Sequence, residues 1–272
     1  MKRSLSLIIP VYNTVQSLEY ILTALQRQSM KDFEIIIADD GSGPDIRLLI
    51  EHIRHQFPFP ITHLWQPDEG FRKNAILNKA IVASQTDYLV FIDGDCIPHR
   101  EFLADHVRNR VPQSLLCGRR VNLSRQISDE LTLNDIMSGR FERFSLRLLI
   151  DGLLAKSSNL EDGLRINNSS LRAILHRNKA RILGSNFSVQ KQLLEKINGF
   201  NEDYNSYGLG EDSDIAFRLQ LLNVQLVSLR YQAVVYHLFH PTKQVSDENR
   251  CRYEGMIRVA EPICKNGLKK LE

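Results

Sequence analysis

The run Asp93-Gly94-Asp95 places two carboxylates one residue apart, directly after the apolar stretch Tyr88–Ile92. In an open α/β sheet, ligands bind beyond the carboxyl ends of the strands, so both carboxylates can reach one site. Their hard oxygen atoms suit Mg²⁺ or Mn²⁺, and such an ion can bridge a diphosphate and neutralise the charge that develops as it leaves. A plain surface turn is the alternative, because Asp and Gly are common turn residues.

Two further acidic runs carry candidate chemistry. In Asp39-Asp40-Gly41-Ser42 a carboxylate can accept from a base N–H or a ribose hydroxyl, or it can simply form a turn before Pro44. In Gly210-Glu211-Asp212-Ser213-Asp214 a carboxylate at a helix start can take the proton from an attacking hydroxyl. Acidic residues at a helix start are also stabilised by capping and by the helix dipole, which is the structural alternative.

His237 and His240 follow an apolar run near the end of the chain. A neutral imidazole from this pair can complete a metal site. A purely structural role is the alternative, and the residues alone leave both open.

These candidate residues need elements that bring them together. Short apolar runs predict strands, and helical spacing of apolar side chains predicts helices between them. Strands are expected at residues 4–10, 33–38, 61–65 and 88–92, and helices at residues 15–28, 44–56 and 72–84. Strands that alternate with helices of this length predict a parallel, doubly wound α/β sheet.

The later chain divides into two differently patterned parts. Residues 121–182 have helical patterning and many arginines, which fits either solvated amphipathic helices or a basic face that meets phosphate or anionic lipid head groups. Beyond residue 183 we expect helices at 191–196, 211–222 and about 248–260, with a strand at 226–235 that leads to His237.

The bulk composition excludes several classes of protein. Hydrophobic residues make up 43% and charged residues 25% of the 272 residues, which argues against disorder. A net charge of +3 is too small to indicate a nucleic-acid partner. The sequence shows no targeting segment and no apolar run long enough for a membrane span, and the scattered cysteines fit reduced thiols. We therefore expect a cytoplasmic protein.

Taken together, these runs resemble a family 2 glycosyltransferase with the GT-A fold. The opening Leu7-Ile8-Ile9-Pro10-Val11-Tyr12-Asn13 resembles the family's first strand. Asp39-Asp40-Gly41-Ser42 resembles its nucleoside-binding motif, Asp93-Gly94-Asp95 its metal motif, and Gly210-Glu211-Asp212-Ser213-Asp214 its catalytic motif. The resemblance implies a mostly parallel, Rossmann-like central sheet flanked by helices, with a helical insertion.

The resemblance also implies a role for each matching position. Donor contacts are implied at Pro10, Tyr12, Asp40, Arg72, Asp93 and Gly94. Asp212 matches the catalytic base of inverting members, and Glu211 would orient the acceptor, with Tyr207 and Asp214 beside it. The metal, Mn²⁺ or Mg²⁺, would be held by Asp95 and His237, with Asp93 shared between ribose and metal.

The later half resembles the subgroup that includes the galactosyltransferase and chondroitin polymerase catalytic regions. In that subgroup a run like Gly184-Ser185-Asn186-Phe187 precedes the acidic motif, and a histidine after the last strand binds metal, which His237 matches. One departure concerns the acceptor platform. The subgroup's tryptophan and paired glycines are replaced by Tyr207-Gly208-Leu209-Gly210.

The expected organisation follows from these motifs. Residues 1–120 form a nucleotide-sugar-binding half, 121–182 a basic helical insertion on the acceptor side, 183–240 the catalytic half of the same domain, and 241–272 a helical tail. We expect a metal-dependent, inverting transfer of a hexose or N-acetylhexosamine from a UDP-sugar to a glycan or lipid-linked acceptor. Family habits place such a chain in bacterial lipopolysaccharide, O-antigen or capsule synthesis, with peripheral contact to an anionic inner membrane face.

Three other functions compete with this interpretation. A sugar nucleotidyltransferase needs a glycine-rich phosphate loop after the first strand, and Pro10-Val11-Tyr12-Asn13-Thr14 has no glycine. A dinucleotide-dependent oxidoreductase fails for the same reason. A catalytically degenerate protein that only holds a nucleotide-sugar is disfavoured by the intact Asp93, Asp95 and Asp212.

Overall fold

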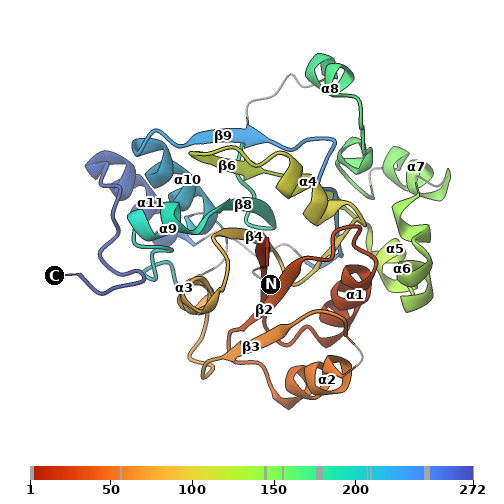
Figure 1. The fold of residues 1–272 in the computed structure, drawn as a ribbon, viewed down its shortest axis with the longest axis horizontal. Coiled ribbons are helices and arrows are strands. Elements are labelled where there is room, and N and C mark those ends of the chain that lie inside the picture. Colours follow the sequence, from red (N-terminus) through yellow and green to blue (C-terminus); the bar gives the residue numbers. More distant parts are fainter. Residues whose placement is uncertain are drawn as a thin grey trace.

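The computed structural model describes residues 3–55, 57–143, 146–154, 156–175, 180–206, 208, 210–241 and 246–271. In these residues a seven-stranded main sheet has the spatial order β3-β2-β1-β4-β8-β6-β9 (Figure 1). Its strands are β1 (Leu5–Val11), β2 (Phe33–Asp39), β3 (Ile61–Trp65), β4 (Tyr88–Ile92), β6 (Ser114–Cys117), β8 (Asn186–Gln190) and β9 (Gln225–Ser228).

The main sheet is mostly parallel, which confirms the expected fold class. β1, β2, β3 and β4 pair in parallel, whereas β8 runs antiparallel between β4 and β6. The parallel arrangement predicted from the strand–helix alternation of the first 120 residues holds for β1 to β4, and the antiparallel β8 comes from the later part of the chain. Because β4 pairs with both β1 and β8, the carboxylates that follow β4 lie where the two parts of the chain meet.

Helices cover both faces of the main sheet. Three of them pack their apolar side chains on one face: α1 (Val15–Gln26), α2 (Pro44–Arg54) and α4 (Phe102–Arg108). Three others cover the opposite face: α3 (Lys73–Ala83), α9 (Lys191–Lys196) and α10 (Glu211–Leu221). Each face thus has its own buried core, and the ends of α3 and α10 are carried to the same edge of the sheet.

A second, three-stranded sheet has the order β5-β10-β7, with β5 (Cys96–Pro98), β10 (Val235–His237) and β7 (Arg120–Asn122). The predicted single strand over residues 226–235 is wrong in this respect, because β9 belongs to the main sheet and β10 to the small one. Between them the backbone turns through Tyr231 and Ala233, which have positive φ values of 66° and 44°. Because of this turn, β10 pairs with β5 and His237 lies beside that strand.

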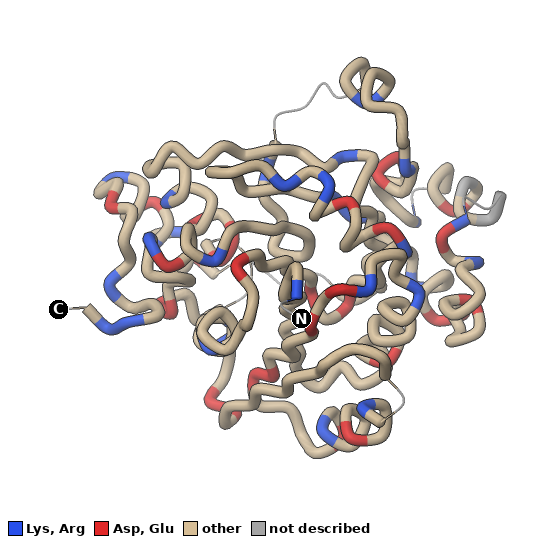
Figure 2. The backbone as a smooth tube through the Cα atoms, viewed as in Figure 1, with Lys and Arg blue, Asp and Glu red and all other residues tan. Residues whose placement is uncertain are grey.

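The expected helical insertion is present between β7 and β8. Its helices are α5 (Arg125–Glu130), α6 (Leu133–Ser138), η1 (Arg140–Glu142), α7 (Leu146–Leu153), η2 (Leu160–Gly163) and α8 (Ser169–Leu175). Acidic and basic residues alternate along it (Figure 2). Two of its described arginines, Arg140 and Arg165, form ion pairs with Asp135 and Asp105.

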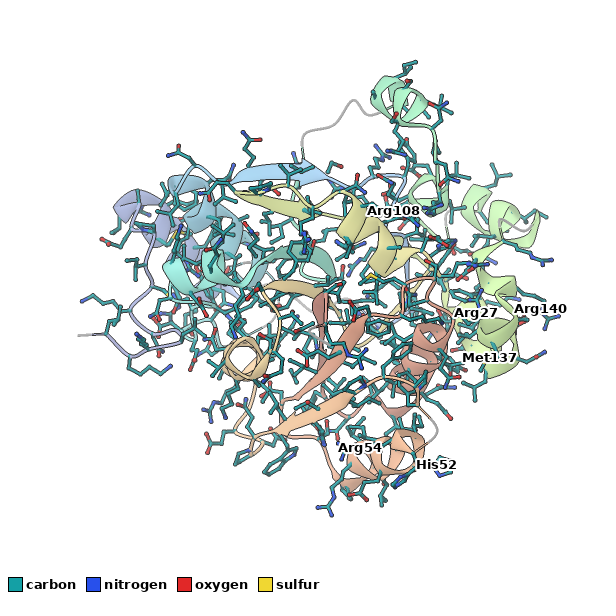
Figure 3. The ribbon with its side chains drawn as sticks, in the orientation of Figure 1. Arg27, His52, Arg54, Arg108, Met137 and Arg140 are labelled. Atoms are coloured by element: carbon teal, nitrogen blue, oxygen red, sulfur yellow. The ribbon has the colours of Figure 1, made fainter. Side chains whose placement is uncertain are left out.

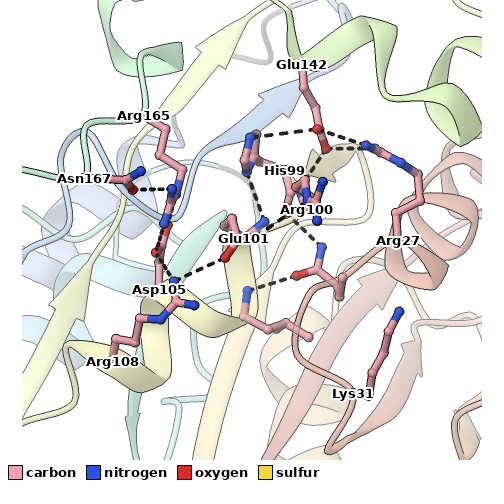
Figure 4. A network of polar contacts seen from close by, with 12 residues as sticks. Arg27, Lys31, His99, Arg100, Glu101, Asp105, Arg108, Glu142, Arg165 and Asn167 are labelled. Carbon is pink, nitrogen blue, oxygen red and sulfur yellow. Dashed lines mark hydrogen bonds and ion pairs between the residues drawn. The ribbon is translucent and has the colours of Figure 1, made fainter.

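Two ion pairs fasten the insertion to the first half of the chain (Figure 4). Glu142 accepts hydrogen bonds from both terminal nitrogens of Arg27, at 2.8 and 3.0 Å. Arg165 donates to both oxygens of the fully buried Asp105, at 2.8 and 2.7 Å. Arg27 and Arg140 lie at the same edge of the molecule (Figure 3). These charge-assisted pairs fix the inner edge of the insertion.

The last helix, α11 (Asp247–Val259), packs against α10. Of the helices that the structure describes, none combines the length and the apolar character needed to cross a lipid bilayer. The four cysteines are free, and Cys251 alone among them is exposed.

Candidate active site

The residues predicted to contact a donor gather where β1 and β2 end. Asp40 accepts hydrogen bonds from the side-chain amide of Gln66, at 2.6 Å, and from the backbone N–H of Arg72, at 2.9 Å. Burial raises the pKa of Asp40 above its ordinary value, although both hydrogen bonds act in the opposite direction. The Arg72 guanidinium forms an ion pair with Glu69 at the protein surface.

Tyr12 and the loop before α3 close this end. The Tyr12 hydroxyl donates to Asp68 at 2.9 Å, and the ring is 44% exposed, so a base can stack on it. Gly41 has a φ of 93°, and a Cβ there would lie 2.5 Å from the Asp68 backbone. Only glycine therefore lets the loop pack directly onto the Asp39-Asp40-Gly41-Ser42 turn.

A half-buried lysine joins the Asp93-Gly94-Asp95 motif to the Glu211-Asp212 motif. Lys73, at the first position of α3, lies 2.8 Å from Asp93 Oδ1 and 2.5 Å from Glu211 Oε1. Burial lowers the pKa of Lys73, but the two carboxylates outweigh burial and raise it above its ordinary value, so the ammonium stays charged. Position 94 accommodates only glycine, because a Cβ there would lie 2.4 Å from the Pro10 carbonyl oxygen.

Asp212 is held in place by backbone donors. Its Oδ2 accepts from the Gly184 N–H at 2.7 Å, and its Oδ1 accepts from the Ser213 N–H at 2.7 Å. Burial raises the pKa of Asp212, and these hydrogen bonds oppose the shift. Gly210 has a φ of 115° and packs against Tyr204, which lets α10 start at this point with Asp212 in its first turn. A raised pKa makes this carboxylate a better proton acceptor.

Three possible metal ligands converge beside the second aspartate of the metal motif. Asp95 Oδ2 lies 3.5 Å from His237 Nε2 and 3.3 Å from His240 Nε2. The two Nε2 atoms are 3.1 Å apart. The convergence follows from the small sheet, since β10 pairs with β5 so that His237 is opposite Cys96, the residue after Asp95.

These separations fit one divalent ion. Two ligand atoms bound at right angles at about 2.1 Å from an ion lie about 3.0 Å apart. Asp95, Cys96 and His237 also offer ligand atoms within 4.8 Å of one another. However, burial raises the pKa of the Cys96 thiol well above its ordinary value, and the neutral thiol faces Asp95 Oδ1 at 3.4 Å. One carboxylate and two imidazoles are thus the groups here that could hold an ion without loss of the thiol proton.

A small cavity lies between the end of β1 and the start of α10. It is lined by Pro10, Lys73, Leu77, Phe91, Gly184, Phe187, Phe200, Glu211 and Asp212. Residues from the first strand, from α3 and from α10 thus surround one space. The structure brings together the predicted Pro10, Glu211 and Asp212, and it places Asp93 beside them through Lys73.

Two predicted acceptor residues have different outcomes. Asp214 is fully buried and forms an ion pair with the equally buried Arg218, which also donates to the Ile197 and Gly199 carbonyls. The expectation that Asp214 binds an acceptor is wrong, because this carboxylate anchors α10 to the loop before it. Tyr207 lies outside the described residues.

Sequence reasoning missed Lys73 and the Gly184 N–H. A signal for Lys73 was present, since a cation in the first turn of a helix is opposed by the helix dipole and needs a compensating partner. The backbone donor of Gly184 leaves no signal in the residue type. The sequence left open whether His240 takes part in a metal site beside His237. Its Nε2 atom lies near both Asp95 and His237, and we call Asp95, His237 and His240 the metal group.

Two family models match separate parts of the chain. The model described as "Glycosyl transferase family 2" matches residues 6–113, which contain the donor and metal motifs. The model described as "N-terminal domain of galactosyltransferase" matches residues 168–241, which contain the catalytic motif and both histidines. Both matches are to glycosyltransferase models, so the chain is similar to family 2 glycosyltransferases over these residues, in agreement with the resemblance of its motifs.

Proteins similar in sequence to this chain include two chondroitin synthases. The one from Escherichia coli is 26% identical over 258 residues, which cover 88% of this chain and 35% of the relative. The one from Pasteurella multocida (strain Pm70) is 25% identical over 79% of this chain and 23% of the relative. The chain thus spans about a third or less of the length of these relatives.

Solved structures with the same fold support the architecture. The mannosyltransferase PcManGT from Pyrobaculum calidifontis, solved with GDP-Man and Mn²⁺, superimposes with a TM-score of 0.61 at 16% identity, over 95% of this chain and 65% of that chain. S. aureus TarS residues 1–349, solved with UDP, gives a TM-score of 0.59 at 18% identity, over 94% of this chain and 65% of that chain. The GT-A fold expected from the motifs is confirmed.

Proposed function

We propose that this glycosyltransferase moves a hexose or N-acetylhexosamine from a UDP-sugar to a glycan or lipid-linked glycan, with inversion at the anomeric carbon and with a bound divalent metal. The observation that carries the proposal is the convergence of two groups: the Asp95, His237 and His240 ligand atoms, and the Asp93–Lys73–Glu211 bridge that ends beside Asp212. A metal for the diphosphate and a base for the acceptor are the two requirements of such a transfer.

Asp212 takes the part of the base in this mechanism. The acceptor oxygen forms a bond to the anomeric carbon, the bond from that carbon to the diphosphate breaks, and the acceptor proton passes to Asp212. The Gly184 and Ser213 N–H groups fix the carboxylate while this happens. Attack from the face opposite the leaving group inverts the configuration. Glu211, paired with Lys73, orients the acceptor hydroxyl.

The residues of the metal group favour Mn²⁺ over Mg²⁺. Mg²⁺ prefers oxygen ligands and retains several waters, whereas imidazole nitrogen suits transition metals better. When bound, the ion would neutralise charge on the departing UDP. Asp95, His237 and His240 would hold it, and the proposal leaves Asp93 to the donor ribose and to Lys73.

The donor proposal rests on the nucleoside end and on related proteins. Asp40, Tyr12 and Arg72 surround the end of β1 and β2, where a uracil and its ribose are recognised in this proposal. The related TarS structure holds UDP, and the PcManGT structure holds a GDP-sugar with Mn²⁺. A role in bacterial lipopolysaccharide, O-antigen or capsule assembly at the cytoplasmic membrane face is the corresponding cellular proposal.

Release of UDP tests this proposal. The wild-type chain, given Mn²⁺ and a panel of UDP-sugars, is expected to release UDP from at least one donor. Asp212→Asn removes the proton acceptor and keeps its shape, so we expect about a 100-fold or larger loss of transfer with unchanged UDP affinity. Glu195→Gln, an exposed change on α9, is the control.

Each outcome separates the proposal from its rivals. Wild-type binding of UDP and metal without any turnover would identify a nucleotide-sugar-binding protein that has lost catalysis. Formation of a nucleotide-sugar from a nucleoside triphosphate would identify a sugar nucleotidyltransferase. A chain that neither binds UDP with metal nor cleaves any UDP-sugar contradicts the proposal as a whole.

A further inference from the structure

A second cavity, of about 340 Å³, lies beside the catalytic residues. It is lined by residues from the end of β6 to β7, from η2 and from two loops: Arg119, Arg120, Asn122, Asn159, Glu161, Asp162, Leu183 and Arg230. None of these residues has a part in the mechanism above. We call this space the arginine cavity.

The arginine cavity adjoins the catalytic site on two sides. Leu183 is followed by Gly184, whose N–H holds Asp212. Arg120 and Asn122 belong to β7, which pairs in parallel with β10 so that Asn122 is opposite His237. The walls of this cavity therefore continue directly into the segments that hold Asp212 and His237.

The arginines that line the cavity differ in whether a carboxylate pairs with them. Arg230 is compensated, because its guanidinium lies 2.7 Å from Asp162 and 3.1 Å from Glu161. Among the described residues, no carboxylate lies within 4.0 Å of the guanidinium of Arg119 or Arg120. Both side chains are half-buried, so each loses part of its hydration without gaining an ion-pair partner.

A hydrogen-bond acceptor in the same wall is also without a partner. The Asn122 side-chain nitrogen donates to Ser158 Oγ at 2.9 Å, but its Oδ1 is buried with no donor in the part of the chain described. Within the described residues, two cations without an ion-pair partner and one acceptor without a donor match a ligand that carries both an anionic group and hydroxyls. An acidic or phosphorylated sugar has this combination.

We propose that the arginine cavity binds an anionic group of the acceptor, with Arg119 and Arg120 contacting its oxygens. Guanidinium groups present paired donors that match carboxylate or phosphate oxygens. This inference rests on the proposed function, because it takes Asp212 as the base that meets the acceptor hydroxyl. It adds the chemical class of the acceptor: a glycan that bears a carboxylate or phosphate close to the hydroxyl that is glycosylated.

The test compares acceptors that differ only in charge. The carboxylate arm uses an oligosaccharide ending in a hexuronic acid and its neutral methyl ester, and the phosphate arm uses a lipid-diphosphate-linked sugar and the same sugar on a neutral lipid. The variant is Arg119→Gln/Arg120→Gln. The control, Arg47→Gln/Arg258→Gln, removes two exposed charges elsewhere.

The variant should raise the KM for one anionic acceptor by about tenfold or more, which corresponds to the loss of a charge-assisted hydrogen bond. We expect the KM for the neutral partner, UDP affinity and the slow hydrolysis of donor to change less than about twofold. The arm that responds identifies carboxylate or phosphate. An equal effect on neutral and anionic acceptors, or a weaker UDP affinity, would overturn the inference; the second result would assign the arginines to the donor diphosphate.

Binding measured without turnover separates this inference from the proposed function. Titration calorimetry of each anionic acceptor into the wild type and the variant needs no catalysis. Wild-type binding that the variant loses supports the cavity even if no transfer is found. If the wild type and the variant bind an anionic acceptor with equal affinity and the wild type glycosylates that acceptor, the arginine cavity does not bind its anionic group. The proposed function would then still hold.

Discussion

Lys73 holds two acidic residues of the site at a fixed separation. Its ammonium lies between Asp93 and Glu211, and all three are largely shielded from water. Without the lysine, two carboxylates would face each other in a medium of low dielectric, where like charges repel strongly. The same residue starts α3 next to Arg72, whose backbone N–H meets Asp40. One position thus links the nucleoside, metal and catalytic motifs.

Replacing this lysine tests that link. Lys73→Gln is expected to lower kcat by about 10- to 100-fold, because Glu211 loses the partner that orients it. The free energy of unfolding should also fall by about 1–3 kcal/mol, as a buried charge network loses its cation. Steady-state UDP release and urea unfolding measure the two effects, with the exposed Lys196→Gln as the control. Wild-type values of both quantities would contradict this role.

At the scale of elements, a chain of hydrogen bonds locks β8 between β4 and α4. The Ser188 hydroxyl lies 2.8 Å from the Tyr88 hydroxyl and 2.8 Å from His106 Nδ1. His106 Nε2 donates to Asn186 Oδ1 at 3.1 Å, and the Asn186 amide donates to the Arg119 and Ala233 carbonyls. The antiparallel strand is thereby joined to the turns that present the arginine cavity and His237.

This lock predicts a pH-dependent stability. Burial lowers the pKa of His106 from 6.5 to about 4, so the native state keeps the imidazole neutral where the unfolded chain is protonated. Stability from this histidine is therefore complete above pH 6.5 and falls as the pH drops towards 4. Between pH 7 and 5, the wild type should lose about 2 kcal/mol more than His106→Gln.

Urea unfolding of both proteins at the two pH values measures this difference. Parallel pH dependences of the wild type and the variant would show that His106 is not the titrating group. The comparison is between two slopes, so it is valid even where the substitution lowers stability at both pH values.

Across the whole molecule, the metal group connects the two sheets. Asp95 follows β4 of the main sheet, and His237 ends β10 of the small one. An ion held by both would cross-link parts of the chain that are far apart in sequence. Such a ligand binds the folded state alone and therefore stabilises it.

Mn²⁺ should accordingly raise the melting temperature. At 100 times its dissociation constant, a ligand adds about 2.7 kcal/mol, which is several degrees for a chain of this size. We expect His237→Ala and His240→Ala each to reduce the shift strongly, and an exposed control, His52→Ala, to retain it. Thermal unfolding with and without Mn²⁺ measures it. A full shift in His237→Ala would place the ion elsewhere.

The accuracy of the sequence predictions depends on what each pattern encodes. β3, β4 and α9 were predicted with their observed bounds, because apolar runs and helical spacing report local structure. The antiparallel β8 and the split of residues 226–235 between two sheets were missed, because an apolar run does not specify the strand with which it pairs. The motifs located Asp212 and Asp95 but gave Asp214 a role that burial beside Arg218 excludes.

The position of β8 also has a consequence for synthesis of the protein. The edge of β4 that β8 covers belongs to the wholly apolar strand Tyr88–Ile92, and residues 93–185 must be made before its partner emerges. At bacterial and eukaryotic translation rates this takes about 5 to 20 seconds. During that interval the nascent chain presents an unpaired apolar edge, the kind that recruits other strands. Slow production or chaperone shortage should therefore lead to aggregation through β4 before any loss of activity in the molecules that finish folding.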